Sequence, residues 1–519
     1  MSAKALMILG TGSHAGKSLI TAALCRILAQ DGYRVAPFKS QNMALNSAAT
    51  PDGAEIGRAQ AMQAEAARVI PTADMNPILL KPSSDTTSQV VLQGRVWGQV
   101  SAADYFNHAV KELFPAVLES YERLARDYEV VVLEGAGSPA EINLRDHEIV
   151  NMRMAEAANA SCILIGDIDR GGVFASLVGT LQLLDENERK RIHGYLINKF
   201  RGDVNLLQPA LEMMKDYMTI PCVGVIPYLS HVGLDEEDGV AIEDRRTAAR
   251  VWRDDDQDSP VRPLRIGVIA LPHMSNFTDF DAVAAEPSVA LAYLSHAREV
   301  READIIIIPG SKQTLDDLNW LRTHGFENAI RQHSGPVVGI CGGMQMLGNA
   351  VHDAGGREGG GQMPGLGLLP IRTTLVEEKV TQLTTAQLIA PHLFDQAMTC
   401  DTTHGYEIHL GTTEYQPGTR PLLAITRSDG ATSFDGVASS DGNIIGTYLH
   451  GFFDDDDFRH SFINAARAAL RLAPPAAYVN FRADREARFD RLAAHVRQSI
   501  DYDAILNFLG LAKAAGSSR

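Results

Sequence analysis

The 519-residue chain lacks features that mark several classes of protein. It has only five cysteines, none in a CxxC pair, which argues against a disulfide framework or a cysteine zinc site and suits a reducing cytoplasm. Lys and Arg number 47 against 64 Asp and Glu, a formal charge of −17, so the surface is poorly suited to nucleic acid or anionic membranes. No apolar run approaches the roughly 18 residues of a membrane span, and no signal peptide is recognisable. We therefore expect a cytoplasmic protein without a nucleic-acid or membrane partner.

The strand pattern predicts two α/β domains. Short apolar runs alternate with helical patterns, which is typical of parallel sheets covered on both faces. In the first half these runs are 5–9, 130–133, 162–165, 195–198 and 222–226, and in the second half they are 264–270, 304–309, 336–340 and 444–449. The predicted division is a first domain over 1–235, a charged linker over 236–262, a second domain over 263–455 and a helical extension over 456–519. Apolar residues at helical spacing from Phe489 to Ile500 predict that the terminal helix docks onto the body.

The first apolar run leads into a glycine-rich loop and then a helical pattern. The loop reads G-T-G-S-H-A-G-K-S over residues 10–18. Gly12 and Gly16 let backbone N–H groups approach phosphate oxygens, Lys17 supplies a positive charge, and the Ser18 hydroxyl is a ligand for Mg²⁺. One residue more separates Gly10 from the Gly-Lys pair than in the standard phosphate-binding loop. The order of strand, loop and helix nevertheless predicts a site for ATP.

Two further polar residues stand at the ends of predicted strands. Glu134 follows the apolar run 130–133, and we expect its carboxylate to be a ligand on the Mg²⁺ side of the site. Asn198 ends the run 195–198, where its amide either reads the edge of adenine or caps a turn. Residue types and spacing leave both interpretations of Asn198 open.

These segments resemble the dethiobiotin-synthetase-like branch of P-loop proteins, whose loop has this longer spacing and whose members activate carboxylates with ATP. The resemblance implies a doubly wound N-terminal domain and a second phosphate-side lysine at Lys39. The single residue is equally consistent with an ordinary surface lysine.

A second motif, G-I-C-G-G over residues 339–343, lies between a predicted strand and a predicted helix. Small residues on both sides of Cys341 allow the strained turn that exposes a nucleophilic thiol. A thiolate of this kind needs a base that also protonates the leaving amine, and His450 is best placed because it ends the apolar run 444–449. His404 and His409 are the competitors. The oxyanion requires two N–H donors, for which we select Gly342 and Gly310.

The second half resembles a class I glutamine amidotransferase, a flavodoxin-like domain in which cysteine releases ammonia from glutamine. The common pattern has Glu two residues beyond the His, whereas this chain has Phe452. That departure is similar to the cobyric acid and cobyrinic acid amidase subgroup, to which a Cys/His pair is assigned. The residue that orients His450 is therefore open, with Glu407 as one candidate.

Along essentially the whole chain, the sequence resembles the cobyric acid synthase family. The resemblance is carried by the order of the two halves and by the segments at 38–47, 133–141, 166–172 and 341–345. The resemblance implies ATP- and glutamine-dependent amidation of the b, d, e and g carboxylates of adenosylcobyrinic acid a,c-diamide, giving cobyric acid through an acyl phosphate. It implies Mg²⁺ with ATP, L-glutamine as nitrogen donor, no tightly bound protein metal and a corrinoid substrate, and it leaves a homo-oligomer open. The rivals are an ATP-driven switch with an inert second domain and an amidase for another polycarboxylate or a cell-wall precursor.

Overall fold

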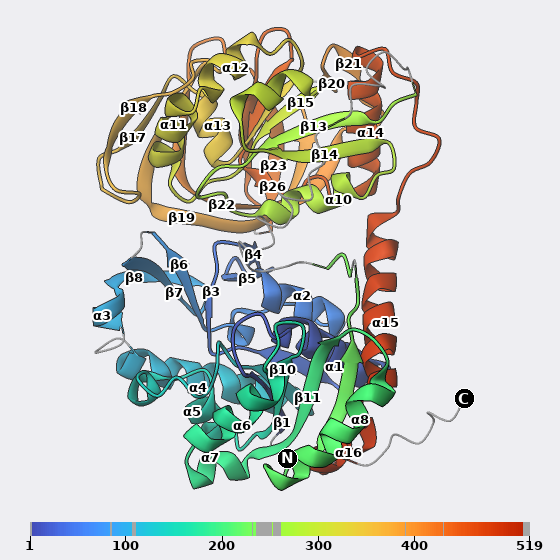
Figure 1. Ribbon diagram of the computed structural model, residues 1–519. Helices are drawn as coiled ribbons and strands as arrows, with labels where there is room; N and C mark the ends of the chain where they lie inside the picture. Colours follow the sequence, from blue (N-terminus) through green and yellow to red (C-terminus); the bar gives the residue numbers. More distant parts are fainter. Residues whose placement is uncertain are drawn as a thin grey trace. The chain divides into compact units, whose positions relative to one another are not determined.

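The computed structural model divides the chain into two compact units, each built on a mixed α/β plan as expected (Figure 1). It describes residues 3–83, 86–105, 110–230, 232–234, 252, 261–389, 391–428 and 430–511. The first unit comprises Met1–Ala44, Glu55–Asp235 and Arg485–Arg519, and the second comprises Leu45–Ala54 and Glu236–Asp484. Most of the linker expected over 236–262 lies outside the described residues.

The first unit is organised around a parallel sheet of strand order β12-β11-β10-β1-β9-β2. The strands are β1 Lys4–Gly10, β2 Val35–Phe38, β9 Val130–Glu134, β10 Ser161–Asp167, β11 Ile192–Phe200 and β12 Cys222–Pro227. The central strands are buried on both faces, which explains their continuous apolar sequences. A smaller sheet contains β3 Gln41–Met43, β6 Ile78–Pro82, β7 Thr87–Leu92 and β8 Arg95–Ser101.

Helices connect and cover the strands of the first unit (Figure 1). Helix α1, Lys17–Gln30, follows β1 directly, and ten of its residues are buried. The other helices are α2 Arg58–Ala66, α3 Ala102–Asp104, α4 Val110–Asp127, α5 Met152–Ala157, α6 Val173–Leu183, α7 Glu186–Lys190 and α8 Val204–Met213. Strand β5, Glu55–Gly57, leads into α2.

The second unit has a sheet of order β14-β13-β15-β16-β25-β24-β23-β19-β17-β18. Its strands are parallel from β14 to β25 and mostly antiparallel beyond β25, although β17 pairs with β19 in parallel. The parallel strands are β13 Leu264–Ile269, β14 Val289–Leu294, β15 Ile305–Ile308, β16 Val337–Ile340 and β25 Ile444–Thr447. The rest are β17 Ala350–Asp353, β18 Gly361–Pro364, β19 Ile371–Leu388, β22 Thr402–Tyr415, β23 Pro421–Arg427, β24 Thr432–Ala438 and β26 Leu449–His450. Strand β4, Ser47–Ala49, belongs to this unit.

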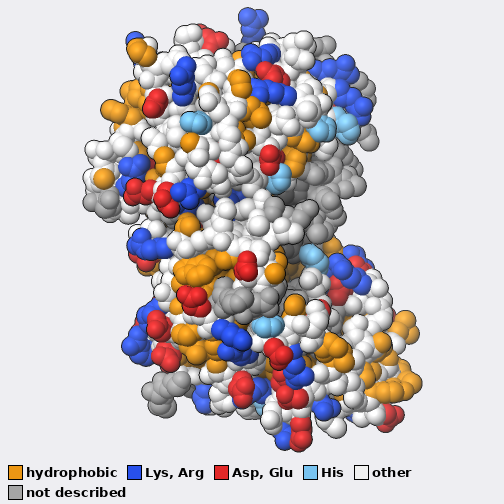
Figure 2. Space-filling model, turned by 90° about the vertical axis from the view of Figure 1, so that its left-hand side faces the viewer, with side chains coloured by type: hydrophobic (Ala, Val, Ile, Leu, Met, Phe, Trp, Pro, Cys, Tyr) orange, Lys and Arg blue, Asp and Glu red, His pale blue; other side chains and the backbone are white. Residues whose placement is uncertain are grey.

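The second unit contains several short helices, of which α13, Gly342–Leu347, directly follows the predicted nucleophile. The unit also contains the 3₁₀ turns η6 Phe277–Phe280 and η7 Ala297–Glu302, and the helices α10 Asp281–Ala284, α11 Thr314–Thr323, α12 Phe326–Gln332 and α14 Asp456–Ala469. Within the described part of the chain, no helix combines the length and apolar character needed to cross a membrane. On the face drawn in Figure 2, the described basic and acidic side chains are interspersed.

The helical extension expected over 456–519 is divided between the units. Helix α14 packs in the second unit, whereas most of α15, Phe481–Ser499, and all of α16, Tyr502–Leu509, belong to the first. Phe489, Leu492 and Val496 are buried in a cluster with apolar residues of α1, so the predicted docking is confirmed. A charged contact reinforces it: Arg26 of α1 is fully buried and donates to Asp490 Oδ1 at 2.8 Å and Glu486 Oε2 at 2.5 Å.

Replacing Arg26 by methionine is expected to loosen α15 from the first unit. The change keeps apolar volume but removes two charged hydrogen bonds, a loss of about 2 kcal/mol in local stability. Hydrogen exchange followed by mass spectrometry should show peptides of α15 exchanging roughly 30-fold faster, the factor that corresponds to this energy. Arg491→Met, an exposed substitution on the same helix, is the control. Equal protection of α15 in both variants would show that the Arg26 contacts contribute nothing.

Candidate active sites

The phosphate-binding loop predicted at 10–18 connects β1 to α1. Gly16 lies at the start of α1 with φ 94°, and a Cβ there would overlap the Asn198 amide, so glycine is required for both backbone conformation and space. Lys17 Nζ reaches across the loop and donates to Gly12 O at 2.9 Å and to Gly137 O at 3.1 Å. The ammonium group is thus held where the loop curls, as a charge for phosphate oxygens.

Glu134 is the centre of a buried polar cluster at the carboxyl end of β9. Its carboxylate accepts from Ser18 Oγ at 2.8 Å, Lys39 Nζ at 2.9 Å and Gln63 Nε2 at 2.5 Å. Burial acts to raise the pKa of Glu134, but the charge of Lys39 and the hydrogen bonds from Lys39, Gln63 and Ser18 outweigh it and lower the pKa. Glu134 is therefore a carboxylate beside a hydroxyl, and these hard oxygen donors suit Mg²⁺.

The sequence left two interpretations open for each of Lys39 and Asn198, and the structure gives the contacts of both. Lys39 is only 6% exposed and paired with Glu134, so the surface-lysine interpretation is wrong. Asn198 donates from Nδ2 to Ala15 O at 2.8 Å, which braces the phosphate-binding loop, a role that neither sequence interpretation included. The next residue, Lys199, also holds the loop through His14 O at 2.7 Å, and sequence analysis missed it along with Gln63. Adenine reading by Asn198 stays a prediction.

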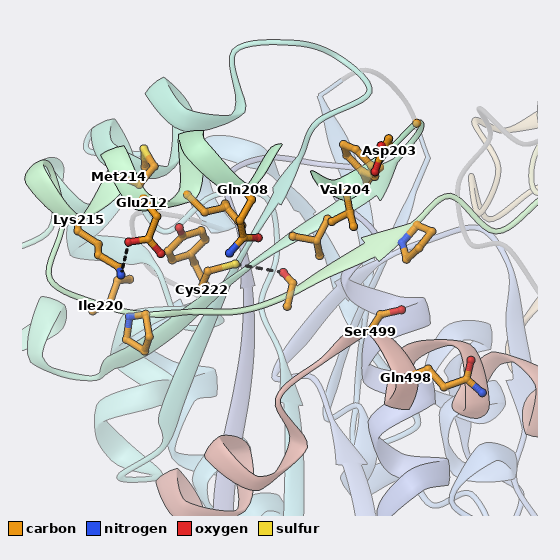
Figure 3. Close-up of a pocket in the computed structure, with 18 residues that line it drawn as sticks. Asp203, Val204, Gln208, Glu212, Met214, Lys215, Ile220, Cys222, Gln498 and Ser499 are labelled. Carbon is orange, nitrogen blue, oxygen red and sulfur yellow. Dashed lines mark hydrogen bonds and ion pairs between the residues drawn. The ribbon is translucent and has the colours of Figure 1, made fainter. Parts of the chain in front are cut away.

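A pocket of about 840 Å³ opens elsewhere in the first unit, between β11, β12 and α8 (Figure 3). Its lining includes Gln208, Cys222 and an ion pair between Glu212 and Lys215 at 2.5 Å. None of the residues predicted to bind ATP is among those that line it. The pocket is therefore distinct from the phosphate-binding loop.

In the second unit, Cys341 occupies a strained turn between β16 and α13. Its backbone has φ 51° and ψ −109°, an unfavourable conformation for a residue with a Cβ. The flanking glycines are required by space: a Cβ on Gly339 would lie 2.7 Å from Met344 N, and one on Gly343 would overlap Ile308 O. This is the geometry of a nucleophile elbow, in which strain is retained to present the side chain.

His450 is buried beside Cys341 and is held by a carboxylate. Its Nδ1 donates to Asp279 Oδ2 at 2.7 Å, and its ring also hydrogen-bonds the Cys341 side chain. Burial acts to lower the pKa of His450, but the charge and hydrogen bond of Asp279, together with Cys341, raise it to about 10. The imidazolium form is thus stabilised next to the thiol, as a nucleophilic cysteine requires.

Asp279 was missed by the sequence analysis. It lies on η6, about 170 residues before His450 in the chain, so no local spacing connects the two. Its second oxygen, Oδ1, accepts from Gly451 N at 3.1 Å and from the Tyr406 hydroxyl at 3.4 Å. Phe452 at the usual position of the acid put a full triad in doubt and left the third member of the site open.

The other candidates around Cys341 have different partners. Glu407 accepts from Arg427 Nε at 3.0 Å and from Thr384, so it is not the carboxylate on His450 Nδ1. His404 is exposed and contacts Thr385, and His409 bonds Gly411 O and stacks on Tyr448.

Gly310 and Gly342, selected as oxyanion donors, both lie beside the nucleophile. A Cβ on Gly310 would stand 3.1 Å from His450 Cε1, and one on Gly342 would stand 2.9 Å from Ser311 N. The loop after β15 therefore packs directly against the elbow. Cys341, His450 and Asp279, together with these two glycines, form an arrangement suited to acyl transfer through a thioester.

Comparisons with known proteins match both units of the chain. The family model described as the CobQ/CobB/MinD/ParA nucleotide binding domain matches residues 6–242, and that of the CobB/CobQ-like glutamine amidotransferase domain matches 265–458. A curated cobyric acid synthase of Clostridium botulinum is 46% identical over 98% of this chain and 99% of its own length. The proteins of the same name from Yersinia enterocolitica and Syntrophobacter fumaroxidans are 46% and 45% identical, over 97% and 98% of this chain and 98% and 99% of their own lengths.

Replacing Asp279 by asparagine is expected to move the alkaline limb of glutamine hydrolysis to lower pH. The limb falls where His450 loses its proton, and Asp279 supplies the charge that raises this pKa. We expect kcat to fall about a hundredfold and the limb of kcat/KM against pH to shift downward. Glu407→Gln, which alters the neighbouring buried carboxylate, should leave the limb in place. A shift in Glu407→Gln together with none in Asp279→Asn would reverse the assignment.

Proposed function

The chain belongs to the cobyric acid synthase family of glutamine-dependent amidation ligases, and from that premise we propose that it converts adenosylcobyrinic acid a,c-diamide to cobyric acid by amidating the b, d, e and g carboxylates. One observation carries this proposal. A phosphate-binding loop with a carboxylate beside its serine and a Cys-His-Asp arrangement occur in one chain that matches the curated relatives over nearly their whole length. Such a chain can both activate a carboxylate and release ammonia.

In the first step, a corrinoid carboxylate oxygen attacks the γ-phosphorus of ATP, giving an acyl phosphate and ADP. The backbone of Gly12 and Gly16 and the ammonium of Lys17 bind the phosphates. The ammonium of Lys39, which contacts the Glu134 carboxylate, adds positive charge on the phosphate side of the site. Ser18 and Glu134 would hold Mg²⁺, which offsets the negative charge of the phosphates. Asn198 holds the loop and, in this proposal, also faces the adenine ring.

In the second step, the Cys341 thiolate attacks the side-chain amide carbon of glutamine. Backbone N–H groups at Gly342 and Gly310 stabilise the oxyanion, and the His450 imidazolium gives its proton to the leaving nitrogen, which departs as ammonia. Neutral His450 then takes a proton from water, which hydrolyses the thioester to glutamate and restores the thiolate. Asp279 keeps the ring oriented throughout.

Ammonia then attacks the acyl phosphate, the C–O bond to phosphate breaks, and the carboxamide and inorganic phosphate are released. Only unprotonated ammonia is a nucleophile, and in bulk water near neutral pH most of it becomes ammonium. Making ammonia on the chain that consumes it therefore favours amidation.

Mass spectrometry of the corrinoid tests the substrate. Incubation of adenosylcobyrinic acid a,c-diamide with the protein, Mg-ATP and glutamine should convert four carboxylates to carboxamides in steps, each lowering the mass by about 1 Da, the difference between a carboxylic acid and its amide. The reaction without ATP is the control. An unchanged corrinoid in a preparation that still hydrolyses glutamine would mean that the acceptor is a different polycarboxylate.

Two substitutions separate the two chemistries. Cys341→Ala should abolish amidation from glutamine yet retain it from ammonium salts, because the thiol acts only in releasing ammonia. Lys17→Ala should lower amidation from either source by at least about a hundredfold, because it removes a charge from the phosphates in both cases. Loss of ammonia-dependent synthesis in a folded Cys341→Ala protein would contradict separate sites, and full activity in Lys17→Ala would remove the loop from the mechanism.

A further inference from the structure

Residues 309–313, called the oxyanion loop below, join β15 to α11 and include Gly310. All five are buried. A Cβ on Gly310 would stand 3.1 Å from His450 Cε1, and one on Gly342 would stand 2.9 Å from Ser311 N and 3.2 Å from Ser311 Cβ. The oxyanion loop is thus in direct contact with the elbow, and the direction of its N–H groups determines how well a negative oxygen is stabilised there.

Two backbone hydrogen bonds join the oxyanion loop to the segment that follows β13. Ser275 N donates to Gly310 O at 2.9 Å, and Lys312 N donates to His273 O at 3.0 Å. These bonds enclose one isolated antiparallel bridge between the two segments. The segment after β13 then leads directly into the turn that carries Asp279. Because a single bridge is a small contact, the backbone alone leaves the oxyanion loop weakly held.

Asp317, in the first turn of α11, connects the same two segments through its side chain. It is fully buried. Its Oδ2 accepts from the Ser311 hydroxyl at 2.6 Å, and its Oδ1 accepts from His273 Nδ1 at 2.9 Å. His273 N lies 3.3 Å from both oxygens, and the Ser311 hydroxyl in turn accepts from Gln313 N at 3.0 Å. One carboxylate therefore holds the oxyanion loop on one side and the facing segment on the other.

The contact between Asp317 and His273 pairs a buried charge with one that reaches solvent. The His273 side chain is 42% exposed, whereas that of Asp317 is inaccessible. The hydrogen bond to Asp317 raises the pKa of His273 against the effect of burial, and the negative charge of Asp317 adds to the rise. Separating such a pair would leave a buried charge without compensation, so the carboxylate is held firmly in one position.

We propose that Asp317 is a positioning residue for the glutamine site: by holding Ser311 and His273 together, it fixes the direction of the N–H groups in the oxyanion loop. The proposal rests on the proposed function, because it takes glutamine as the substrate of Cys341. Its consequence is that two carboxylates have separate tasks. Asp279 acts through His450 on proton transfer, and Asp317 acts through the oxyanion loop on the charge that develops on the carbonyl oxygen.

Two reactions of Cys341 separate these tasks. Hydrolysis of glutamine passes through an oxyanion, whereas in alkylation by iodoacetamide the thiolate sulfur bonds to the CH₂ carbon and iodide leaves, so no oxyanion forms. Asp317→Asn should lower kcat for glutamine about a hundredfold and change KM by less than about twofold, because the N–H donors act mainly on the transition state. The rate of Cys341 alkylation should stay within about twofold of the wild type. Glutamate release with Mg-ATP and the corrinoid present gives the first rate, and mass spectrometry of the Cys341 peptide gives the second.

Matched variants accompany this test. Asp316→Asn, an exposed change next to Asp317 on the same helix, should behave as the wild type in both reactions. Ser311→Ala removes the hydroxyl that donates to Asp317 but keeps the backbone N–H, and it should lower kcat about tenfold with unchanged alkylation. If thermal unfolding shows that Asp317→Asn is not folded, Ser311→Ala is read in its place.

Two results would overturn the proposal. Equal losses of hydrolysis and alkylation would mean that Asp317 supports only the fold around Cys341, and wild-type hydrolysis in the folded variants would mean that the oxyanion loop does not need it. Failure of the proposed function looks different: a wild-type protein whose Cys341 is alkylated but which releases no glutamate from glutamine would overturn the assigned nitrogen donor.

Discussion

Parallel strands buried on both faces determine where chemistry takes place in both units. Such strands leave no room for polar side chains along their length, so polar groups gather where the strands end. In the first unit, Glu134 and Asn198 lie at the carboxyl ends of β9 and β11, next to the loop that follows β1. In the second, Cys341 follows β16 and Gly310 follows β15. The two sites use different groups but share this one constraint.

Burial gives the charged groups at these edges their chemical character. Glu134 and His450 are both enclosed, and burial alone would neutralise each of them. Each is kept ionised by an opposite charge in direct contact, Lys39 for Glu134 and Asp279 for His450. The carboxylate is thereby ready for a cation, and the imidazolium is ready to donate its proton. The sequence analysis left Lys39 with two interpretations and did not identify Asp279.

The sequence predicted what local patterns determine. Lys17 and Ser18 follow a strand and open a helix, and Cys341 stands between glycines whose Cβ positions are filled by neighbouring backbone, so each motif fixes its own geometry. The contacts of Lys39, Gln63 and Asp279 depend instead on which strands become neighbours. Because β2 pairs with β9, Lys39 comes to Glu134 across 95 residues, and Asp279 meets His450 across 171. No spacing rule covers such separations.

The same reasoning explains why linear domain boundaries describe this chain poorly. The first half contributes Leu45–Ala54 to the second unit, and the end of the chain contributes most of α15 and all of α16 to the first. Each contribution contacts an element that carries a candidate reactive group. Arg26 ties α1, which begins at Lys17, to α15. Asn46 of the segment Leu45–Ala54 accepts from Phe277 N in the turn that carries Asp279. A segment spanning only 263–455 would contain Cys341, His450 and Asp279 but would leave Asn276 without the Ser47 amide that holds its side chain. The turn that carries Asp279 is therefore held in part by residues from the same half of the chain as the phosphate-binding loop.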